Sequence, residues 1–135
     1  EKNPDIKVFL SDPYGSSLYN FFKNNKLKSV GDSITEGIGQ GRITKNFEGI
    51  ELDDALRVKD DEALLIIFKL LKEEGLFLGG SSGVNVAGAI KLAKRLGPGH
   101  NIVTILCDSG QRYQSKIWNP VFLKSKNLPI PDWLM

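Results

Sequence analysis

The chain has 135 residues, which suffice for one domain or part of one, because domains commonly contain about 100–150 residues. Its 18 basic and 16 acidic residues give a net charge of +2 and are scattered, so no polybasic tract marks a nucleic-acid-binding protein. No apolar run approaches the roughly 18–20 residues that span a bilayer, no signal peptide is visible, and the single cysteine predicts a cytoplasmic location.

The first half of the chain predicts a strand, a short helix, a long loop and a second strand. Residues 6–10 are rich in β-branched and aromatic side chains and precede a Ser-Asp-Pro turn, so they predict a strand. Ser16 or Ser17 is expected to cap a short helix. Residues 28–48 are rich in glycine and polar residues, and a loop of this length in a compact domain usually has a function. Residues 53–58 predict a short strand or an extended link.

Two amphipathic helices are predicted in the second half. Apolar residues recur at helical spacing over residues 62–74, where Asp60 or Asp61 is expected to cap the helix and Gly75 to end it. The next helix is predicted over residues 83–96, because its apolar side chains share one face and its basic side chains the other.

A further strand and a last short helix follow. Residues 102–106 form a continuous apolar run of the kind found in buried parallel strands, and Cys107 at its end predicts a buried, unreactive thiol. Asn119 and Pro120 predict the start of the short helix. Because strands alternate with helices, the expected fold is α/β, with a mostly parallel sheet flanked by helices.

The most informative motif is Gly-Gly-Ser-Ser-Gly at residues 79–83, just before the second long helix. Such a turn presents free backbone N–H groups and two hydroxyls at a helix N-terminus, where anionic or electron-rich ligands are favoured. Taken alone, the motif is explained as well by Ser81 or Ser82 capping the helix. No Cys/His cluster predicts a metal site, and the only histidine, His100, lies in a turn rather than beside a nucleophile.

Three other motifs accompany this one. They are Asp-Pro-Tyr-Gly-Ser at residues 12–16, Thr-Glu-Gly-Ile-Gly-Gln-Gly at residues 35–41 and Cys-Asp-Ser-Gly-Gln-Arg-Tyr at residues 107–113. Ligands in open α/β sheets bind beyond the carboxyl ends of the strands, so the four motifs are expected to converge on one crevice. In this order they resemble the C-terminal part of cysteine synthase (O-acetylserine sulfhydrylase), a fold-type II pyridoxal-phosphate enzyme, and the likeness runs over essentially the whole chain.

The resemblance implies that residues 1–135 are a single partial domain, an incomplete part of the fold-type II architecture. The family's Schiff-base Lys motif and its Gly-Thr-Gly-Gly-Thr phosphate loop do not occur in this sequence, so the chain alone is expected to be inactive, with no catalytic residue of its own. For the full-length enzyme the resemblance implies synthesis of L-cysteine from O-acetyl-L-serine and sulfide with pyridoxal 5'-phosphate. It also implies a homodimer that docks serine acetyltransferase.

The resemblance assigns site residues as well. It implies that the hydroxyl of Ser81 hydrogen-bonds the pyridine nitrogen of the cofactor, which leaves Ser82 to cap the helix. Gly37, Ile38 and Gly39 resemble the loop that lines the substrate entrance. Three further residues resemble positions near the cofactor ring: Asp108, Ser109 and Tyr113.

Two alternatives remain open from the sequence. Cystathionine β-synthase, a sister enzyme, shares most of these motifs but typically carries an aromatic residue just after the Gly-Ile-Gly unit. This chain has Gln40 there, which favours cysteine synthase. The other alternative is a non-catalytic remnant that keeps only a binding surface, for example one for serine acetyltransferase.

Overall fold

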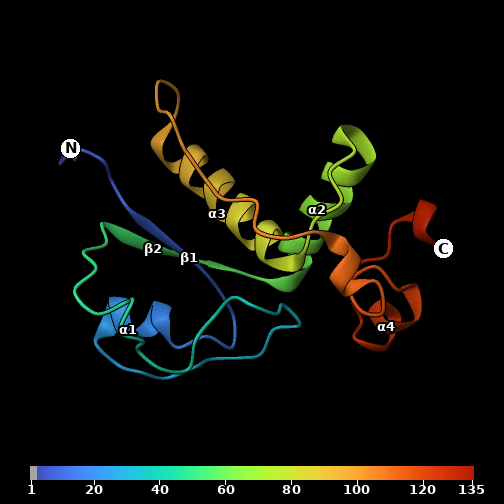
Figure 1. The fold of residues 1–135 in the computed structure, drawn as a ribbon, viewed down its shortest axis with the longest axis horizontal. Helices are drawn as coiled ribbons and strands as arrows, with labels where there is room; N and C mark the ends of the chain where they lie inside the picture. Colours follow the sequence, from blue (N-terminus) through green and yellow to red (C-terminus); the bar gives the residue numbers. More distant parts are fainter. Residues whose placement is uncertain (1–2) are drawn as a thin grey trace.

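A computed structural model describes residues 3–135 of the chain (Figure 1). Two parallel strands, β1 (Phe9–Pro13) and β2 (Asp54–Val58), pair in a register that places Phe9 opposite Asp54 and Pro13 opposite Val58. The parallel α/β arrangement expected from the sequence is therefore confirmed. The helices are α1 (Leu18–Asn24), α2 (Asp60–Glu74), α3 (Gly80–Leu96) and α4 (Pro120–Ser125), with short 3-10 helices η1 (Gly110–Tyr113) and η2 (Asp132–Leu134).

Strand β1 lies three residues beyond the predicted segment 6–10 and includes the Asp-Pro pair that was expected to form the turn. The pairing with β2 explains the shift, because the backbone of Tyr14 still donates to Val58 O at 3.3 Å. Pro13 is tolerated because it occupies the last position of a strand that has only one partner within residues 3–135. The turn then follows at Gly15, whose φ is +81°.

Helix α2 confirms the prediction from apolar spacing, but its cap differs from the expected one. The helix begins at Asp60, so Asp60 and Asp61 belong to its first turn. The cap is made instead by Glu62, whose carboxylate accepts the N–H of Lys59 at 2.8 Å. Gly75 ends the helix in a left-handed conformation, as predicted.

Helix α3 begins at Gly80, three residues earlier than predicted, with Gly79 as its N-cap. The prediction that Ser82 caps this helix is wrong, since Ser82 lies inside the first turn and is fully buried. Its Oγ accepts the backbone N–H of Cys107 at 2.9 Å. The hydroxyl therefore ties α3 to the segment that follows residue 102.

Residues 102–106 do not form the predicted buried strand. They run beside α3 as an extended segment (Figure 1), and Val103 is 88% and Ile105 65% exposed. Cys107, predicted to be buried, is exposed. The apolar residues of this segment would suit a strand inside a sheet, but within residues 3–135 no strand pairs with the segment.

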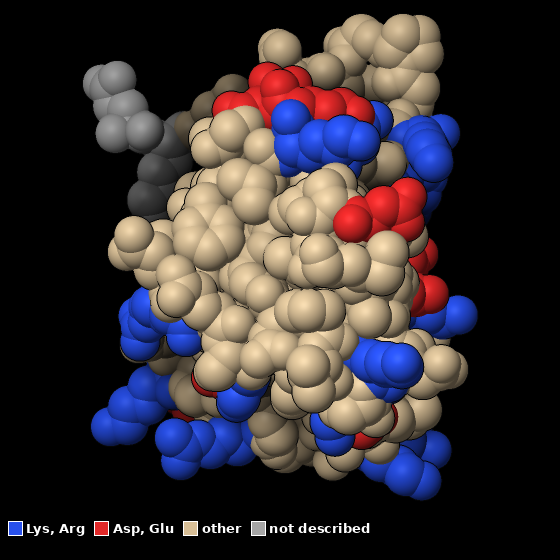
Figure 2. Space-filling model, turned by 90° about the vertical axis from the view of Figure 1, so that its right-hand side faces the viewer, with Lys and Arg blue, Asp and Glu red and all other residues tan. Residues whose placement is uncertain are grey.

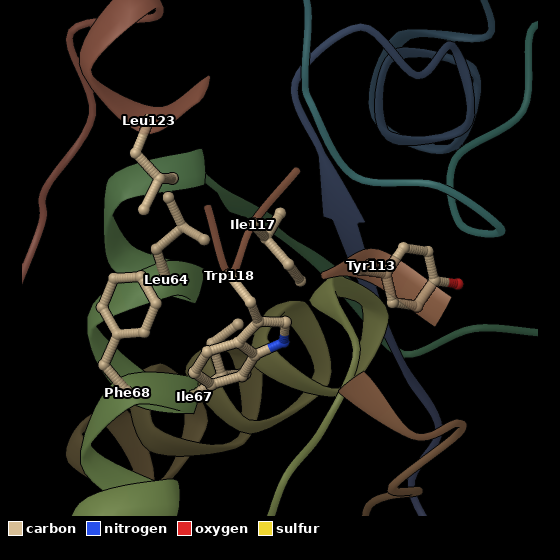
Figure 3. Packing of buried hydrophobic residues seen from close by; sticks show 7 residues of the cluster. All are labelled: Leu64, Ile67, Phe68, Tyr113, Ile117, Trp118 and Leu123. Carbon is tan, nitrogen blue, oxygen red and sulfur yellow. The ribbon is translucent and has the colours of Figure 1, made fainter. Parts of the chain in front are cut away.

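The C-terminal segment packs on α2 through the main hydrophobic cluster. Three side chains of α2 meet residues from η1 to α4, and Phe68 and Trp118 contact edge to face with ring centroids 5.4 Å apart (Figure 3). The loop before α4 ends at Asn119, whose Oδ1 accepts the N–H of Val121 at 2.9 Å, which confirms the predicted helix start. The buried members of this cluster are Leu64, Ile67, Phe68, Tyr113, Ile117, Trp118 and Leu123.

A second, smaller cluster lies where α2, α3 and β2 meet, formed by Val58, Ala63, Val84 and Ala87. On the face that carries α4 and the C-terminus, uncharged residues form the centre and charged residues lie towards the rim, with no continuous basic surface (Figure 2). None of the helices within residues 3–135 has the length and apolar character needed to cross a membrane.

Candidate functional site

The N-terminus of α3 is tied to η1 by the carboxyl group of Asp108. Ser81, in the first turn of α3 and 5% exposed, donates from Oγ to Asp108 Oδ1 at 3.5 Å. The hydroxyl of Tyr113 donates to the other carboxylate oxygen at 2.6 Å. The backbone N–H of Gly79 also donates to the carbonyl of Asp108, at 2.9 Å. Three of the predicted site residues, Ser81, Asp108 and Tyr113, thus form one hydrogen-bonded cluster.

The cluster leaves no room for a larger residue at the helix start. A Cβ at Gly79 would overlap the Asp108 carboxylate and lie 2.6 Å from Cε2 of Tyr113. The hydrogen bond to Asp108, followed by burial, raises the pKa of Tyr113, so its hydroxyl keeps its proton and remains a donor. Figure 3 shows the Tyr113 ring at one side of the hydrophobic cluster with its hydroxyl pointing away from it.

Ser109 has a different place from its neighbours. It is exposed, and its Oγ accepts the N–H of Gln111 at 3.3 Å, so it caps η1. Its side chain has no recorded hydrogen bond to Ser81 or Tyr113 within the described residues. The structure therefore gives Ser109 a local capping role, and its position near a cofactor ring stays a prediction.

The loop at residues 35–41 is held beside the start of α3 by polar contacts that the sequence did not reveal. Asp60 accepts the N–H of Ile34 at 2.9 Å and the hydroxyl of Ser33. Ser33 Oγ lies 2.6 Å from Thr35 Oγ1. Thr35 in turn contacts α3 so closely that a Cβ at Gly80 would lie 3.1 Å from its methyl group. Asp60, predicted as a helix cap, therefore positions this loop.

The same loop is fastened to the turn that follows β1. Ser16 Oγ accepts the N–H of Gln40 at 3.0 Å, and the N–H of Ser17 donates to Gln40 O at 2.8 Å. Gly39 has a φ of +84°, and a Cβ there would lie 3.0 Å from Cγ of Pro13. Glycine is required at this position for both its backbone angle and its close approach.

A cavity of about 310 Å³ opens between these two motifs. Ile38 and Gly39 line it, whereas Gly37 faces open space nearby with a φ of +74°. Ser81 does not line the cavity, but Thr35 does, and Thr35 also contacts Gly80. Of the four motifs, the first two line the cavity and the last two form the Ser81 cluster, and Thr35 contacts both groups. The motifs therefore lie next to one another, but the single crevice that was expected is not what the structure shows.

Asp12, in the first motif, is an anchor that sequence reasoning left without a role. Its buried Oδ2 accepts the N–H of Tyr19 at 2.9 Å and so holds the start of α1. Burial raises the pKa of Asp12 and outweighs hydrogen bonds from Ser16 and Tyr19 and the charge of Arg57. The Arg57 guanidinium lies over the rings of Tyr14 and Tyr19, 5.0 and 4.2 Å from their centroids.

Within residues 3–135, no group of three or more His, Cys, Asp or Glu side chains is placed to hold a metal ion. The candidate site is therefore built from hydroxyls, one carboxylate and glycine backbone. Such a set can accept and donate hydrogen bonds to a polar ring or a small anion.

Comparisons with known proteins agree with the family resemblance inferred from the four motifs. A family model described as "Pyridoxal-phosphate dependent enzyme" matches residues 1–108. Cysteine synthase 2 of Schizosaccharomyces pombe is 43% identical over 94% of this chain, and Cysteine synthase of Dictyostelium discoideum is 41% identical over 98%. The chain spans only 35% and 38% of the length of these two relatives. The crystal structure of O-acetylserine-dependent cystathionine β-synthase from Helicobacter pylori matches 84% of this chain and 35% of its own, with a TM-score of 0.73 and 34% identity.

Proposed function

The chain belongs to the pyridoxal-phosphate-dependent enzyme family, and on that premise we propose that it is the C-terminal segment of an enzyme that makes L-cysteine. The proposed reaction replaces the acetate group of O-acetyl-L-serine by sulfide. Relatives named cysteine synthase, at 41–43% identity, support this choice. When bound, the cofactor supplies an electron sink for bond breaking at the α and β carbons of an amino acid.

The cluster of Ser81, Asp108 and Tyr113 carries the proposal. Helix α3 has Gly79 as its N-cap and no side-chain cap, so no side chain of the N-cap residue occupies the donors of its first turn. The hydroxyl of Ser81 would be the partner of the ring nitrogen. The single O–H of Ser81, which donates to Asp108 in this structure, would turn to donate to the unprotonated ring nitrogen, while Tyr113 continues to hold the Asp108 carboxylate beside it.

A hydroxyl at this position suits replacement at the β carbon. A carboxylate beside the ring nitrogen would stabilise a protonated ring and strengthen its pull on electrons. A neutral hydroxyl at the N-terminus of α3 gives less of this stabilisation, because the helix end itself disfavours a cation. The weaker sink suffices when the substrate carries acetate, a leaving group that departs readily.

The loop at residues 35–41 would cover the substrate. Ile38 and Gly39 line the cavity of about 310 Å³, and Gly37 lies next to it with an open, positive-φ backbone. Glycines on either side of Ile38 would let this segment move over the amino-acid substrate and exclude water. Sulfide would then enter the site through the same cavity.

The remaining parts of the catalytic apparatus would come from the rest of the polypeptide. These parts are the Schiff-base Lys and the phosphate loop, whose motifs do not occur in this sequence. The chain alone would then be inactive. Homodimerisation and docking of serine acetyltransferase belong to the same proposal, on the family resemblance.

The test uses the complete polypeptide that contains residues 1–135. Ser81→Ala is expected to weaken cofactor binding about fivefold, since one hydrogen bond contributes about 1 kcal/mol. Equilibrium dialysis with the cofactor measures this, and cysteine formation from O-acetylserine and sulfide measures the activity. Ser125→Ala, an exposed serine on α4, is the matched control. Equal behaviour of the two variants would remove Ser81 from the site, and cystathionine formation from serine and homocysteine without cysteine formation would favour the sister enzyme.

A further inference from the structure

An ion pair joins the loop at residues 35–41 to the segment that carries the Ser81 cluster. Lys116 Nζ donates to the carboxylate of Glu36, and both side chains are 48% exposed. Glu36 belongs to the loop, whereas Lys116 follows η1 in the chain. The contact therefore bridges the two groups of motifs at the candidate site, and we name it the loop ion pair.

The backbone of Lys116 is held on both sides. Its N–H donates to Tyr113 O at 3.0 Å, and its carbonyl accepts the N–H of Asn119 at 2.9 Å. The next residue, Ile117, is 2% exposed and belongs to the main hydrophobic cluster. The Lys116 side chain thus extends from a fixed part of the molecule, so the loop ion pair acts mainly on the position of Glu36.

Residues 36–39 lie between two anchored segments. Hydrogen bonds to Asp60 hold the chain before them, and hydrogen bonds to Ser16 hold the chain after them. Within the described residues, no hydrogen bond is recorded to the backbone N–H or C=O groups of residues 36–39 themselves. Side chains keep this segment in place instead, because Ile38 packs on the second hydrophobic cluster and Glu36 forms the loop ion pair. Breaking the pair would therefore free one end of the segment.

The charge of Glu36 acts on the Ser81 cluster. The hydrogen bond to Asp108 is the main cause of the raised pKa of Tyr113, and the negative charge of Glu36 adds to it. Two carboxylates thus influence one phenol group, and Lys116 offsets the charge of one of them. Loss of Lys116 would leave repulsion between the carboxylates of Glu36 and Asp108 in place of an attraction.

We propose that Glu36 and Lys116 are positioning residues of the proposed reaction. Their ion pair holds residues 36–39 over the amino-acid substrate, and it breaks to let the substrate enter and the product leave. A pair exposed to this degree shifts an equilibrium by at most about fivefold, so it can break in every turnover and still favour the closed loop. The role in turnover rests on the proposed function, whereas control of the loop by the pair does not.

A cysteine placed at Ile38 measures the position of the loop without the reaction. In the complete polypeptide with Cys107→Ser, Ile38→Cys reacts with iodoacetamide faster when the loop is open, so the labelling rate reports the open fraction. Lys116→Met is expected to raise this rate about fivefold at low salt. Salt at about 1 M should raise the rate of the parent protein towards the same value, because charges are then screened over about 3 Å.

Two further variants make the labelling experiment specific for the loop ion pair. Adding Glu36→Gln to Lys116→Met should lower the labelling rate again, because the repulsion between carboxylates is removed. Lys69→Met, which breaks the exposed pair with Glu73 on α2, is the matched control and should leave the rate unchanged. Effects that multiply in the double variant, or equal rates in Lys116→Met and the parent protein, would overturn the proposal.

Steady-state kinetics of the complete polypeptide connect the loop to the reaction. Lys116→Met is expected to raise KM for O-acetylserine about fivefold and to change kcat less, because the loop then holds the substrate more weakly. A variant that had only lost folded protein would lower kcat and keep KM. An unchanged KM together with faster labelling would overturn the role in turnover. Faster labelling in a protein that forms no cysteine would overturn the proposed function and support control of the loop by the ion pair.

Discussion

The carboxylate of Asp108 receives hydrogen bonds from two hydroxyl groups, those of Ser81 and Tyr113. Two donors on one carboxylate fix its orientation and hold the start of α3 against η1. The same carboxylate lies beside Gly79, where only a glycine fits. The Asp108 carboxylate therefore holds the geometry of the candidate site and keeps the neighbouring Tyr113 hydroxyl protonated.

Replacing Asp108 by Asn tests that control. The hydrogen bond to the carboxylate is the main reason that the pKa of Tyr113 is raised, so Asp108→Asn should move this pKa back towards the ordinary tyrosine value. Ultraviolet titration of the phenolate, as the difference from Tyr113→Phe, isolates the group. An unchanged titration curve in Asp108→Asn would show that the carboxylate does not set this pKa.

A second charged group, Asp54, gives a prediction for acid stability. Its carboxylate contacts Lys23 and, at 2.5 Å, Arg95, and accepts the N–H of Ala55 at 2.8 Å. The hydrogen bonds from Lys23 and Arg95 hold the pKa of Asp54 far below its usual range. Because the folded-state pKa is depressed, the stabilisation is present above the unfolded-state value, near pH 4, and is lost as the pH falls below it.

Asp54→Asn should therefore lower the free energy of unfolding by about 1 kcal/mol at pH 7, since both basic partners are partly exposed to solvent. The difference from the wild type should shrink as the pH is lowered from 5 to 3. Urea unfolding at several pH values measures both effects. A difference that stays constant or grows on acidification would contradict the assigned ion pairs.

At the scale of elements, the contact between α2 and α3 depends on a glycine. A Cβ at Gly83 would lie 2.5 Å from the carbonyl oxygen of Ala63, a backbone atom that cannot move aside alone. The two helices approach closely here and bury Ala63, Val84 and Ala87 beside Val58. Since the site motif at residues 79–83 includes this glycine, the motif has a packing role as well as a proposed functional one.

Gly83→Ala should destabilise the fold by about 1–3 kcal/mol, because overpacking outweighs the helix propensity of alanine. Gly41→Ala is the control, since a Cβ there meets no atom within 4 Å and the backbone angle is ordinary. Thermal unfolding followed by circular dichroism compares the two. Equal stability of both variants would show that the helices can separate without cost.

Sequence patterns predicted the two long helices well and two of the three expected strands poorly, and the difference has a physical cause. Apolar spacing found α2 and α3, because each helix buries one face on neighbours that this chain contains. The same reasoning failed for residues 102–106, because an apolar run records what a segment can bury, not what is present to cover it. The start of β1 was missed because register with β2, a long-range contact, sets where the strand begins.

At the scale of the whole molecule, the proximity of the four motifs was predictable from the tendency of α/β folds to gather binding segments at one end of their strands, although within residues 3–135 only the first motif lies at the end of a strand, β1. The contacts that bring them together were not. Asp60 holds the loop at residues 35–41, and Ser82 binds the segment after residue 102, yet both were expected to cap helices. A capping residue and an anchor for a distant backbone group have the same side-chain chemistry, so local sequence does not separate the two roles.

A cofactor that stays bound to the chain needs a covalent anchor or a phosphate anchor. Several lysines are occupied by carboxylates: Lys23 by Asp54, Lys91 by Glu62 and Lys116 by Glu36. An ammonium group held in this way is a poor nucleophile for the cofactor aldehyde. Pyridoxal 5'-phosphate mixed with the isolated chain should therefore be lost on gel filtration, whereas the complete polypeptide should retain it.

Borohydride, which makes any lysine–cofactor linkage permanent, sharpens this comparison. After reduction, intact-mass spectrometry should show a stoichiometric adduct on the complete polypeptide and none on the isolated chain. The Ser81 cluster then contributes to cofactor binding only when another part of the protein supplies the covalent link. A stoichiometric adduct on one lysine of the isolated chain would mean that residues 1–135 contain their own anchor, and the division of labour proposed between this chain and the rest of the enzyme would be wrong.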